Sequence, residues 1–387
     1  MTLFVIAATS FGLVALAWVL YPAAMWLRSF TPRAAQTPNG QAGERVTVIV
    51  ATRDDPSFAL ARARNLRLSE YPATLLRVLI AVDANSTHDL EAYRTSLAGM
   101  AEVVSGDPPG GKAAALNAGV RAADGSTDVL VFADVGQEFT PGSIPRLVSA
   151  LRDGDFGAIT GRYTHARTDG IMSAYADLEA MIRAGQAAGR SVVSATGAIL
   201  AMRPALWREL PTGLICDDLY TGLSVVRQNS RVGFCSDAVA YDPRVFSREQ
   251  QFTRRVRTLT GLIQYCVVEP GALFPWSNPV WGHFFIHKVL RLLTPLLLAL
   301  GTIAMAVWLI PRALFETMFV VVGLAAAAVL ARVFAPAAFR RTRDQVLWAL
   351  RLMVVPVVAI SNGLRGRWSV WTPTSQVRAN LRADRGA

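Results

Sequence analysis

The chain has 387 residues, enough for one large domain or two ordinary ones, and 52% of them are hydrophobic. The mean hydropathy of +0.33 is high for a soluble protein, because the apolar excess is concentrated at both ends. The formal net charge is +11 and comes far more from Arg than from Lys. Such a positive charge can bind nucleic acid, an anionic membrane surface or a phosphorylated substrate. The sequence carries no nucleic-acid-binding motif, and several Arg flank apolar runs, so we expect a membrane partner and no nucleic acid.

Residues 1–28 predict one membrane-spanning anchor. No charged residue occurs from Leu3 to Trp26, and about 20 apolar residues suffice to cross a bilayer. A secretory signal peptide is the alternative, but it would carry a positive charge before the apolar run, whereas Arg28 and Arg33 follow it. By the positive-inside rule these charges place the next residues in the cytosol. Residues 29–44 are polar and contain Pro and Gly, which predicts a linker.

Residues 45–285 show short apolar runs that alternate with stretches of helical spacing. The runs are rich in β-branched and aromatic residues and predict buried strands. This alternation predicts an α/β fold with a doubly wound, mostly parallel sheet. The predicted strands include Val46–Val50, Leu76–Val82 and Val129–Ala133, and the predicted helices include Phe58–Ser69 and Ala113–Ala122.

The three predicted strands each lead into a turn that carries aspartate: Asp55, Asp83 and Asp134 respectively. Ligands of open α/β sheets bind beyond the carboxyl ends of the strands, so we expect a nucleotide at this edge. A carboxylate in that position can hold a divalent cation against a diphosphate. A lone Asp would more often cap only its strand or turn, but three such turns on one edge favour a binding site.

Two further segments carry candidate side chains. Gly110 and Gly111 precede Lys112 at a predicted helix start, where glycines let a phosphate approach the backbone and Lys adds a charge. A flexible loop with a solvated Lys is the alternative, because the Walker spacing is missing. Asp217 and Asp218 begin another predicted helix. One of them can be the N-cap, which leaves the other as a candidate general base.

The order of these segments resembles the membrane-bound family 2 glycosyltransferases, the group that holds cellulose, chitin and hyaluronan synthases. The similarity runs from about Val46 to Arg291. Its most specific match is Gly111-Lys112-Ala113-Ala114-Ala115-Leu116-Asn117-Ala118-Gly119, which is close to that family's Gly-Lys-x-x-x-Leu-Asn-x-Gly segment. Asp134-Val135-Gly136 stands at the Asp-x-Asp metal site, Asp217-Asp218 at the acidic pair, and Arg254-Arg255-Val256-Arg257-Thr258 where processive members carry Gln-x-x-Arg-Trp.

The resemblance implies a GT-A fold and a role for each matching residue. Asp218 would be the catalytic base, and Asp134 would bind Mg²⁺ or Mn²⁺. The residues that it implies in binding the nucleotide or the substrate are Thr52, Asp55, Asp83, Lys112, Asn117, Asp217, Arg254, Arg255 and Arg257.

Two departures from the family pattern matter: Gly136 in the metal site, and Arg254 for Gln with Thr258 for Trp in the Gln-x-x-Arg-Trp segment. Gly136 replaces the second acid of the metal site, so that Asp134 is the acid of this motif left to face a cation. The diphosphate, water or Gln137 would complete the coordination, and magnesium in any case keeps several waters. Thr258 replaces the Trp that helps to hold a sugar acceptor, which argues against long processive synthesis.

Residues 286–363 predict two or three further membrane segments. Val289–Ile310 and Leu314–Ala331 are each long enough to span. Val346–Ile360 is shorter, is interrupted by a charge and a proline, and precedes a basic tail, residues 364–387. The positive-inside rule keeps that tail in the cytosol, so a re-entrant or interfacial segment competes with a fourth span.

These features predict an integral membrane protein, of a bacterial inner membrane, whose catalytic domain lies in the cytosol. We expect an inverting glycosyltransferase that moves a sugar from a nucleotide-diphosphate sugar, with UDP as the expected nucleotide, to a lipid-linked or polysaccharide acceptor. Two other classes stay open. One is an inactive sugar-nucleotide-binding scaffold, which Gly136 suggests, and the other is a membrane nucleotidyltransferase, which would need a richer acidic metal site.

Overall fold

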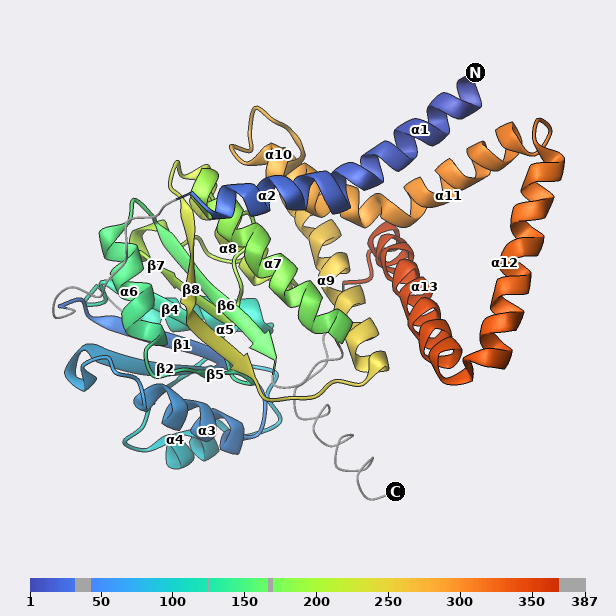
Figure 1. Ribbon diagram of the computed structural model, residues 1–387. Coiled ribbons are helices and arrows are strands. Elements are labelled where there is room, and N and C mark those ends of the chain that lie inside the picture. The colour runs from blue at the N-terminus through green and yellow to red at the C-terminus, as the bar shows by residue number, and fades with distance from the viewer. Residues whose placement is uncertain (32–42, 124, 166–169, 369–387) are drawn as a thin grey trace.

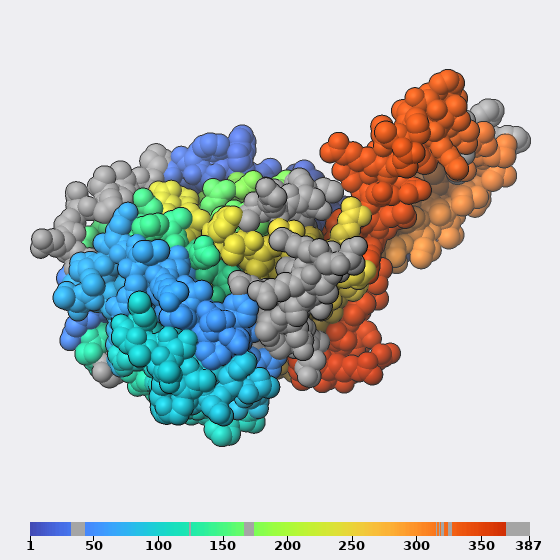
Figure 2. Space-filling model, turned by 90° about the horizontal axis from the view of Figure 1, so that it is seen from below, coloured from blue at the N-terminus to red at the C-terminus, as the bar shows by residue number. Residues whose placement is uncertain are grey.

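The computed structural model describes residues 1–31, 43–123, 125–165 and 170–368. Its centre is an 8-stranded sheet with the strand order β3-β2-β1-β4-β7-β6-β8-β5 (Figure 1). Most of the predicted linker and of the predicted basic tail lies outside the described residues. Orange and red C-terminal helices project from one side of the sheet domain (Figure 2).

Four strands form the parallel half of the sheet. They are β1 (Val46–Thr52), β2 (Leu76–Val82), β3 (Glu102–Ser105) and β4 (Val129–Asp134). The three strands predicted from the sequence are confirmed, and β1 and β4 each continue into the polar turn that follows. The sequence did not predict β3, because this short strand pairs on one side only and lacks a fully buried apolar run.

The other half of the sheet is mixed. β7 (Ile199–Met202) runs antiparallel to both neighbours, β4 and β6 (Ala158–His165). β8 (Val232–Asp242) pairs in parallel with β6 and antiparallel with the short β5 (Glu138–Phe139). The predicted α/β class is confirmed, and this half adds antiparallel pairs to the parallel strands.

Helices cover both faces of the sheet, as the strand–helix alternation predicted. Successive side chains of a strand point to opposite faces, so Val48 and Val50 of β1 join one core whereas Ile49 and Ala51 join another. The first core is covered by α3 (Pro56–Arg67), α4 (Leu90–Leu97) and α6 (Ser143–Asp153), and the second by α5 (Lys112–Ala122), α8 (Asp217–Arg227) and α9 (Arg248–Val268).

The N-terminal apolar segment is one long helix that touches the catalytic domain. α1 (Thr2–Ala15) continues through a π-helical turn into α2 (Tyr21–Ser29). α2 packs on α7 (Gly170–Gly189) so closely that a Cβ at Gly185 would lie 2.1 Å from the Met25 carbonyl oxygen. The anchor is therefore part of the folded body and not a loose tether.

The C-terminal part begins inside a continuous helix. α10 (Trp281–Phe284) leads through a second π-helical turn into α11 (Leu290–Leu309), so the boundary predicted at residue 285 falls within this helix. α12 (Leu314–Phe334) and α13 (Pro336–Leu364) follow. In the described part of the chain, 3 helices are long and apolar enough to cross a membrane: Thr2–Ser29, Trp281–Leu309 and Pro336–Leu364.

The predicted segment Val346–Ile360 is the second half of α13, and this helix lies along α9 of the catalytic domain (Figure 1). Arg351 pairs with Glu249, and the Asn362 amide donates to the Thr260 hydroxyl at 3.3 Å. Polar contacts with a helix of the catalytic domain are unfavourable in the middle of a bilayer. They favour the interfacial alternative, which stays a prediction.

This arrangement predicts a cytosolic C-terminus. A green fluorescent protein fused after Ala387 should fluoresce, and alkaline phosphatase at the same place should be inactive, because the five Arg after Gly363 resist translocation. Phosphatase inserted after Arg312, in the turn between α11 and α12, should be active and serves as the control. High phosphatase activity at Ala387 would show that α13 crosses the membrane.

Candidate active site

The carboxyl ends of β1, β2 and β4 bring the predicted site residues to one edge of the sheet. β1 lies between the other two strands, with Thr52 opposite Val82 and Ala51 opposite Asp134. Asp83 follows β2, and its backbone N–H donates to the Thr52 carbonyl at 2.7 Å. The clustering that the sequence predicted for these turns is therefore present.

Asp83 fixes the glycine loop in front of α5. Its Oδ1 accepts from the backbone N–H groups of Gly111 at 2.7 Å and of Asn85 at 3.0 Å. Gly110 has a φ of +89°, and a Cβ there would lie 2.7 Å from the same oxygen, so a side chain would push the loop away. Asp83 Oδ2 is buried without a hydrogen-bond partner in the described structure. This leaves one acceptor atom beside the loop for a ligand N–H.

Lys112 joins two carboxylates from different elements. Its Nζ lies 2.8 Å from Asp134 Oδ1 at the end of β4, and 3.0 Å from Asp217 Oδ2 at the start of α8. Burial alone would lower the pKa of Lys112, but the two carboxylates raise it above its usual value. Likewise, burial alone would raise the pKa of Asp134, whereas the Lys112 ammonium holds it below its usual value. Lys112, Asp134 and Asp217 thus form one ion-paired group, which we call the lysine–aspartate cluster.

Asp218 differs from its neighbour in its surroundings. Its Oδ1 accepts from the Leu219 backbone N–H at 2.8 Å, and its side chain lines a cavity of about 600 Å³. Burial and the adjacent Asp217 carboxylate raise the pKa of Asp218. A carboxylate whose charged form is disfavoured takes up a proton more readily, which is the property of a general base.

The small-residue turn before β7 completes this part of the site. A Cβ added to Gly197 would lie 3.4 Å from the Asp218 Cβ, 3.5 Å from Asp217 Oδ2 and 3.6 Å from Lys112 Nζ. Gly197 therefore lies against the lysine–aspartate cluster and leaves space beside it.

Helix α9 holds the segment that leads to the acidic pair. Gln264 accepts from the Ile215 N–H at 2.8 Å and donates to the Gly213 carbonyl at 2.9 Å. A Cβ at Gly261 would lie 2.4 Å from Cys216 Sγ, so this contact requires glycine. Gln264 and Gly261 are positioning residues that sequence analysis did not identify.

Gly136 makes room for an arginine. A Cβ at Gly136 would lie 2.5 Å from a terminal nitrogen of Arg244, which follows β8. Arg244 Nε donates to Asp242 Oδ1 and its Nη2 to Asp242 Oδ2, both at 2.7 Å, and Asp242 is fully buried. The guanidinium also lowers the pKa of Asp134, after the larger effects of burial and Lys112. The turn that lost an acid thus gained a neighbouring cation, which the sequence alone did not reveal.

The remaining predicted arginines occupy two places. The Arg254 guanidinium lies 3.9 Å from the Phe246 ring centre and that of Arg255 4.8 Å from the Tyr175 ring centre, and both line the cavity beside Asp218. Arg257 acts on Asp134 electrostatically, since together with Lys112 and Arg244 it lowers the pKa of that carboxyl against the opposing effect of burial. The structure therefore divides these arginines between the cavity beside Asp218 and the lysine–aspartate cluster.

Two predicted residues have other partners. Asp55 is the N-cap of α3 and accepts from the Ser57 N–H at 2.9 Å, although its side chain remains half exposed at the strand edge. The Asn117 amide donates to the Leu210 carbonyl at 3.0 Å and accepts from the Leu210 N–H at 2.9 Å. Asn117 thus holds the loop at Leu210 in place and does not contact the lysine–aspartate cluster.

The acids of the site fit a divalent cation only with help from a ligand. Among the described residues, no group of three or more His, Cys, Asp or Glu could hold a metal ion. Asp134 and Asp217 nevertheless converge on one cationic atom, Lys112 Nζ. Gln137 Oε1 is buried without a partner, while its amide nitrogen donates to Asp242 at 3.2 Å. Two carboxylates suit Mg²⁺ or Mn²⁺ that takes its other ligands from water and a diphosphate.

The chain matches a known protein family. Residues 43–261, more than half of the chain, match the model described as "Glycosyltransferase like family 2". The chain belongs to glycosyltransferase family 2. A comparison with curated protein sequences finds no match. The resemblance to the synthases of cellulose, chitin and hyaluronan within this family stays a prediction.

Solved structures show the same fold. A mannosyltransferase from Pyrobaculum calidifontis, in complex with GDP-Man and Mn²⁺, superposes with a TM-score of 0.68 at 20% identity, over 93% of this chain and 99% of that one. A glucosyl-3-phosphoglycerate synthase from Mycobacterium tuberculosis gives 0.43 at 17% identity, over 61% of this chain and 85% of that one. The first similarity confirms the GT-A fold of the sheet domain, and the superposition extends over nearly the whole chain.

The lysine–aspartate cluster predicts a clear difference between two substitutions in α5. Lys112→Met should lower the free energy of unfolding by about 3 kcal/mol, because it leaves two partly buried carboxylates without their cation. Arg121→Met is the matched control. Arg121 pairs with the exposed Asp107 and Glu209, so its loss should cost at most about 1 kcal/mol. Urea unfolding in detergent measures both, and equal losses would refute the central role of Lys112.

Proposed function

We propose that the protein is an inverting glycosyltransferase that transfers a sugar from a nucleotide-diphosphate sugar to a lipid-linked or saccharide acceptor, at the cytosolic face of a membrane. The observation that carries the proposal is the pair Asp217 and Asp218. One carboxylate is bound to Lys112, while the other has a raised pKa and opens into a cavity. We therefore assign the adjacent acids different roles: Asp217 binds Lys112 on the donor side, and Asp218 faces the cavity on the acceptor side.

The donor would lie along the carboxyl edge of the sheet. Asp83 Oδ2, with no partner of its own, can accept from an N–H of the nucleotide base, and Asp55 lies at the neighbouring turn. Lys112 would face the diphosphate, since an ammonium on phosphate oxygens is a common phosphate contact. The similar mannosyltransferase was solved with GDP-Man, so GDP-sugars should be tested beside the UDP-sugars that the family resemblance implies.

The reaction is a single displacement at the anomeric carbon. The Asp218 carboxylate accepts the proton of an acceptor hydroxyl while the hydroxyl oxygen bonds to that carbon. The bond from the carbon to the donor phosphate breaks, and its electron pair leaves on the nucleoside diphosphate. Lys112 and Arg257 stabilise this developing charge. A divalent cation held by Asp134 and Asp217 would supply further charge neutralisation to the leaving group. One displacement inverts the anomeric configuration.

The apolar helices support action at a membrane. The candidate spans Thr2–Ser29 and Trp281–Leu309 run side by side, since a Cβ at Gly301 would lie 3.1 Å from Ser10 and Phe11. Arg28 ends the first span on the side of the catalytic domain, which favours the cytosolic face and a bacterial inner membrane.

The geometry supports neither the inactive scaffold nor the nucleotidyltransferase. Gly136 suggested an inactive scaffold, but the space beside it is used by Arg244, and a general base with a raised pKa remains. A nucleotidyltransferase would need a cluster of metal-binding acids, and the described residues form no group of three. Hydrolysis of a panel of nucleotide sugars, with and without Mn²⁺, separates an active transferase from a scaffold.

Replacing the base should separate catalysis from binding. Asp218→Asn should lower kcat by about 10²–10⁴-fold while leaving the affinity for the nucleoside diphosphate nearly unchanged. In the native protein kcat/KM should fall as the pH is lowered through the pKa of Asp218, which burial and Asp217 raise above the ordinary value of about 3.9. If Asp217→Asn abolishes transfer and Asp218→Asn does not, the base is assigned to the wrong acid.

Replacing Asp134 should uncouple the nucleotide from the metal. Asp134→Ala should weaken binding of UDP or GDP in the presence of Mn²⁺ by at least about tenfold, because a charge-assisted contact is lost. The difference between affinities with Mn²⁺ and with EDTA should shrink in the variant. Calorimetry measures both quantities, and an undiminished Mn²⁺ effect would place the cation elsewhere.

A further inference from the structure

The cavity beside Asp218 continues to the membrane helices. Its volume is about 600 Å³, and its walls come both from the active site and from the apolar ends of the chain. Asp218 and Thr258 belong to the first group. Trp18 of the N-terminal helix, Pro295 of α11 and Pro356 of α13 belong to the second. The place where α7, α9, α11 and α13 approach one another can be followed in Figure 1.

The side chains that line the cavity include more cations than anions. The cations that line it are Arg183, Arg244, Arg254, Arg255, Lys288 and Arg291, and the lining acids are Glu179 and Asp218. Side chains of this kind are seldom enclosed without counter-charges, because each pays a desolvation penalty. Arg244 is already paired with Asp242 and Arg291 with Glu179, so an anionic ligand would serve chiefly to offset the charge of Lys288 and Arg183.

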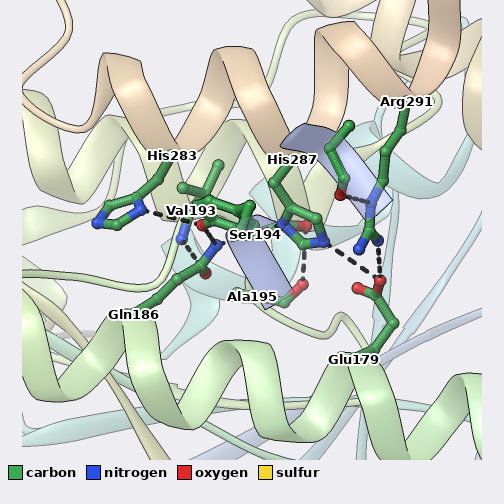
Figure 3. Close-up of polar contacts among 10 residues, drawn as sticks. Glu179, Gln186, Val193, Ser194, Ala195, His283, His287 and Arg291 are labelled. Atoms are coloured by element: carbon green, nitrogen blue, oxygen red, sulfur yellow. Dashed lines mark hydrogen bonds and ion pairs between the residues drawn. The ribbon is translucent and has the colours of Figure 1, made fainter. Parts of the chain in front are cut away.

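The negative charge of Glu179 is already used (Figure 3). Its Oε1 accepts from Arg291 Nη1 at 2.6 Å and lies 3.2 Å from His287 Nε2. This contact ties α7 to the helix that contains α11. Among the described residues, neither Lys288 nor Arg183 has an ion-pair partner of this kind. Lys288 interacts electrostatically with Glu179 and, more weakly, with Asp218, and Arg183 interacts with Lys288, so both cations lie near the reaction centre.

The apolar part of the cavity continues onto lipid-facing surface. Leu296 and Leu300 of α11 are 48% and 51% exposed, and Val354 and Val357 of α13 are 48% and 46% exposed. Exposed apolar faces on both helices that bound the cavity are what acyl chains require. A neutral polysaccharide would match neither these faces nor the cations.

We infer that the cavity binds the acceptor as an anionic lipid, with a head-group phosphate on Lys288 and Arg183 and a head-group hydroxyl against Asp218. This inference rests on the proposed function, because Asp218 is the base of that reaction. The phosphate is a binding handle and is not changed. The hydroxyl oxygen bonds to the anomeric carbon, its proton moves to Asp218, and the nucleoside diphosphate leaves with the electron pair of the broken bond.

Three probes separate the charge from the chains. Dihexanoyl phosphatidylglycerol carries a phosphate, hydroxyls and acyl chains; dihexanoylglycerol lacks the phosphate; and glycerol 1-phosphate lacks the chains. Calorimetry with the full chain in a non-ionic detergent should show that phosphatidylglycerol binds at least about tenfold more tightly than either other probe. Equal affinity for dihexanoylglycerol would overturn the inference.

Variants test the two cations. Lys288→Ala and Arg183→Gln should each weaken phosphatidylglycerol binding by about tenfold and leave dihexanoylglycerol binding unchanged. Lys288→Arg keeps the charge and should restore most of the affinity. Arg340→Gln removes an exposed charge of α13 outside the cavity and is the matched control. Phosphatidylglycerol affinity that is unaffected by Lys288→Ala would refute the assignment.

Measurements of nucleotide binding and sugar transfer distinguish failure of the lipid site from failure of the proposed transferase function. Each variant should bind UDP or GDP as the native chain does, which also shows that it is folded. If the native chain binds phosphatidylglycerol through Lys288 but hydrolyses no nucleotide sugar, the proposed function fails while the lipid site stands. If it transfers sugar to octyl glucoside faster than to phosphatidylglycerol, the lipid acceptor is refuted and the transferase stands.

Discussion

The architecture depends on the position of one ammonium group. Lys112 Nζ holds the end of β4 and the start of α8 together through Asp134 and Asp217, and without it two carboxylates would repel each other across the active site. The glycine loop that carries Lys112 is in turn fixed by Asp83. The carboxyl edge of the sheet and the acidic start of α8 are therefore built as one unit, although their residues come from separate parts of the chain.

The different surroundings of Asp217 and Asp218 at the start of α8 follow from the position of Lys112. Asp217 is neutralised by Lys112, whereas Asp218 lies beside it without that contact and has a raised pKa. The same arrangement thus gives one acid a cationic partner and leaves its neighbour with a raised pKa, which favours proton exchange. Arg244 adds a cation on the other side, because Gly136 leaves room for its guanidinium.

The sequence predicted features that depend on local pattern. β1, β2 and β4 are buried runs ended by polar turns, and the start of α8 is marked by its acids. It did not predict features that depend on tertiary contact. Arg244 reaches Gly136 from a distant strand, the Asn117 amide pairs with the Leu210 backbone, and α13 extends Val346–Ile360 into a longer helix. No periodicity encodes such neighbours.

The close packing of Met25 against Gly185 has a consequence for how substrates arrive. In the proposed membrane orientation, a domain that is fastened to its own anchor helix would not swing away from the bilayer, so its reaction centre would stay at a fixed height above the lipid surface. A soluble donor would reach that height by diffusion in three dimensions. An acceptor held in the membrane instead finds it by lateral diffusion, and the rate of encounter is then set by its density in the leaflet rather than by its concentration in solution.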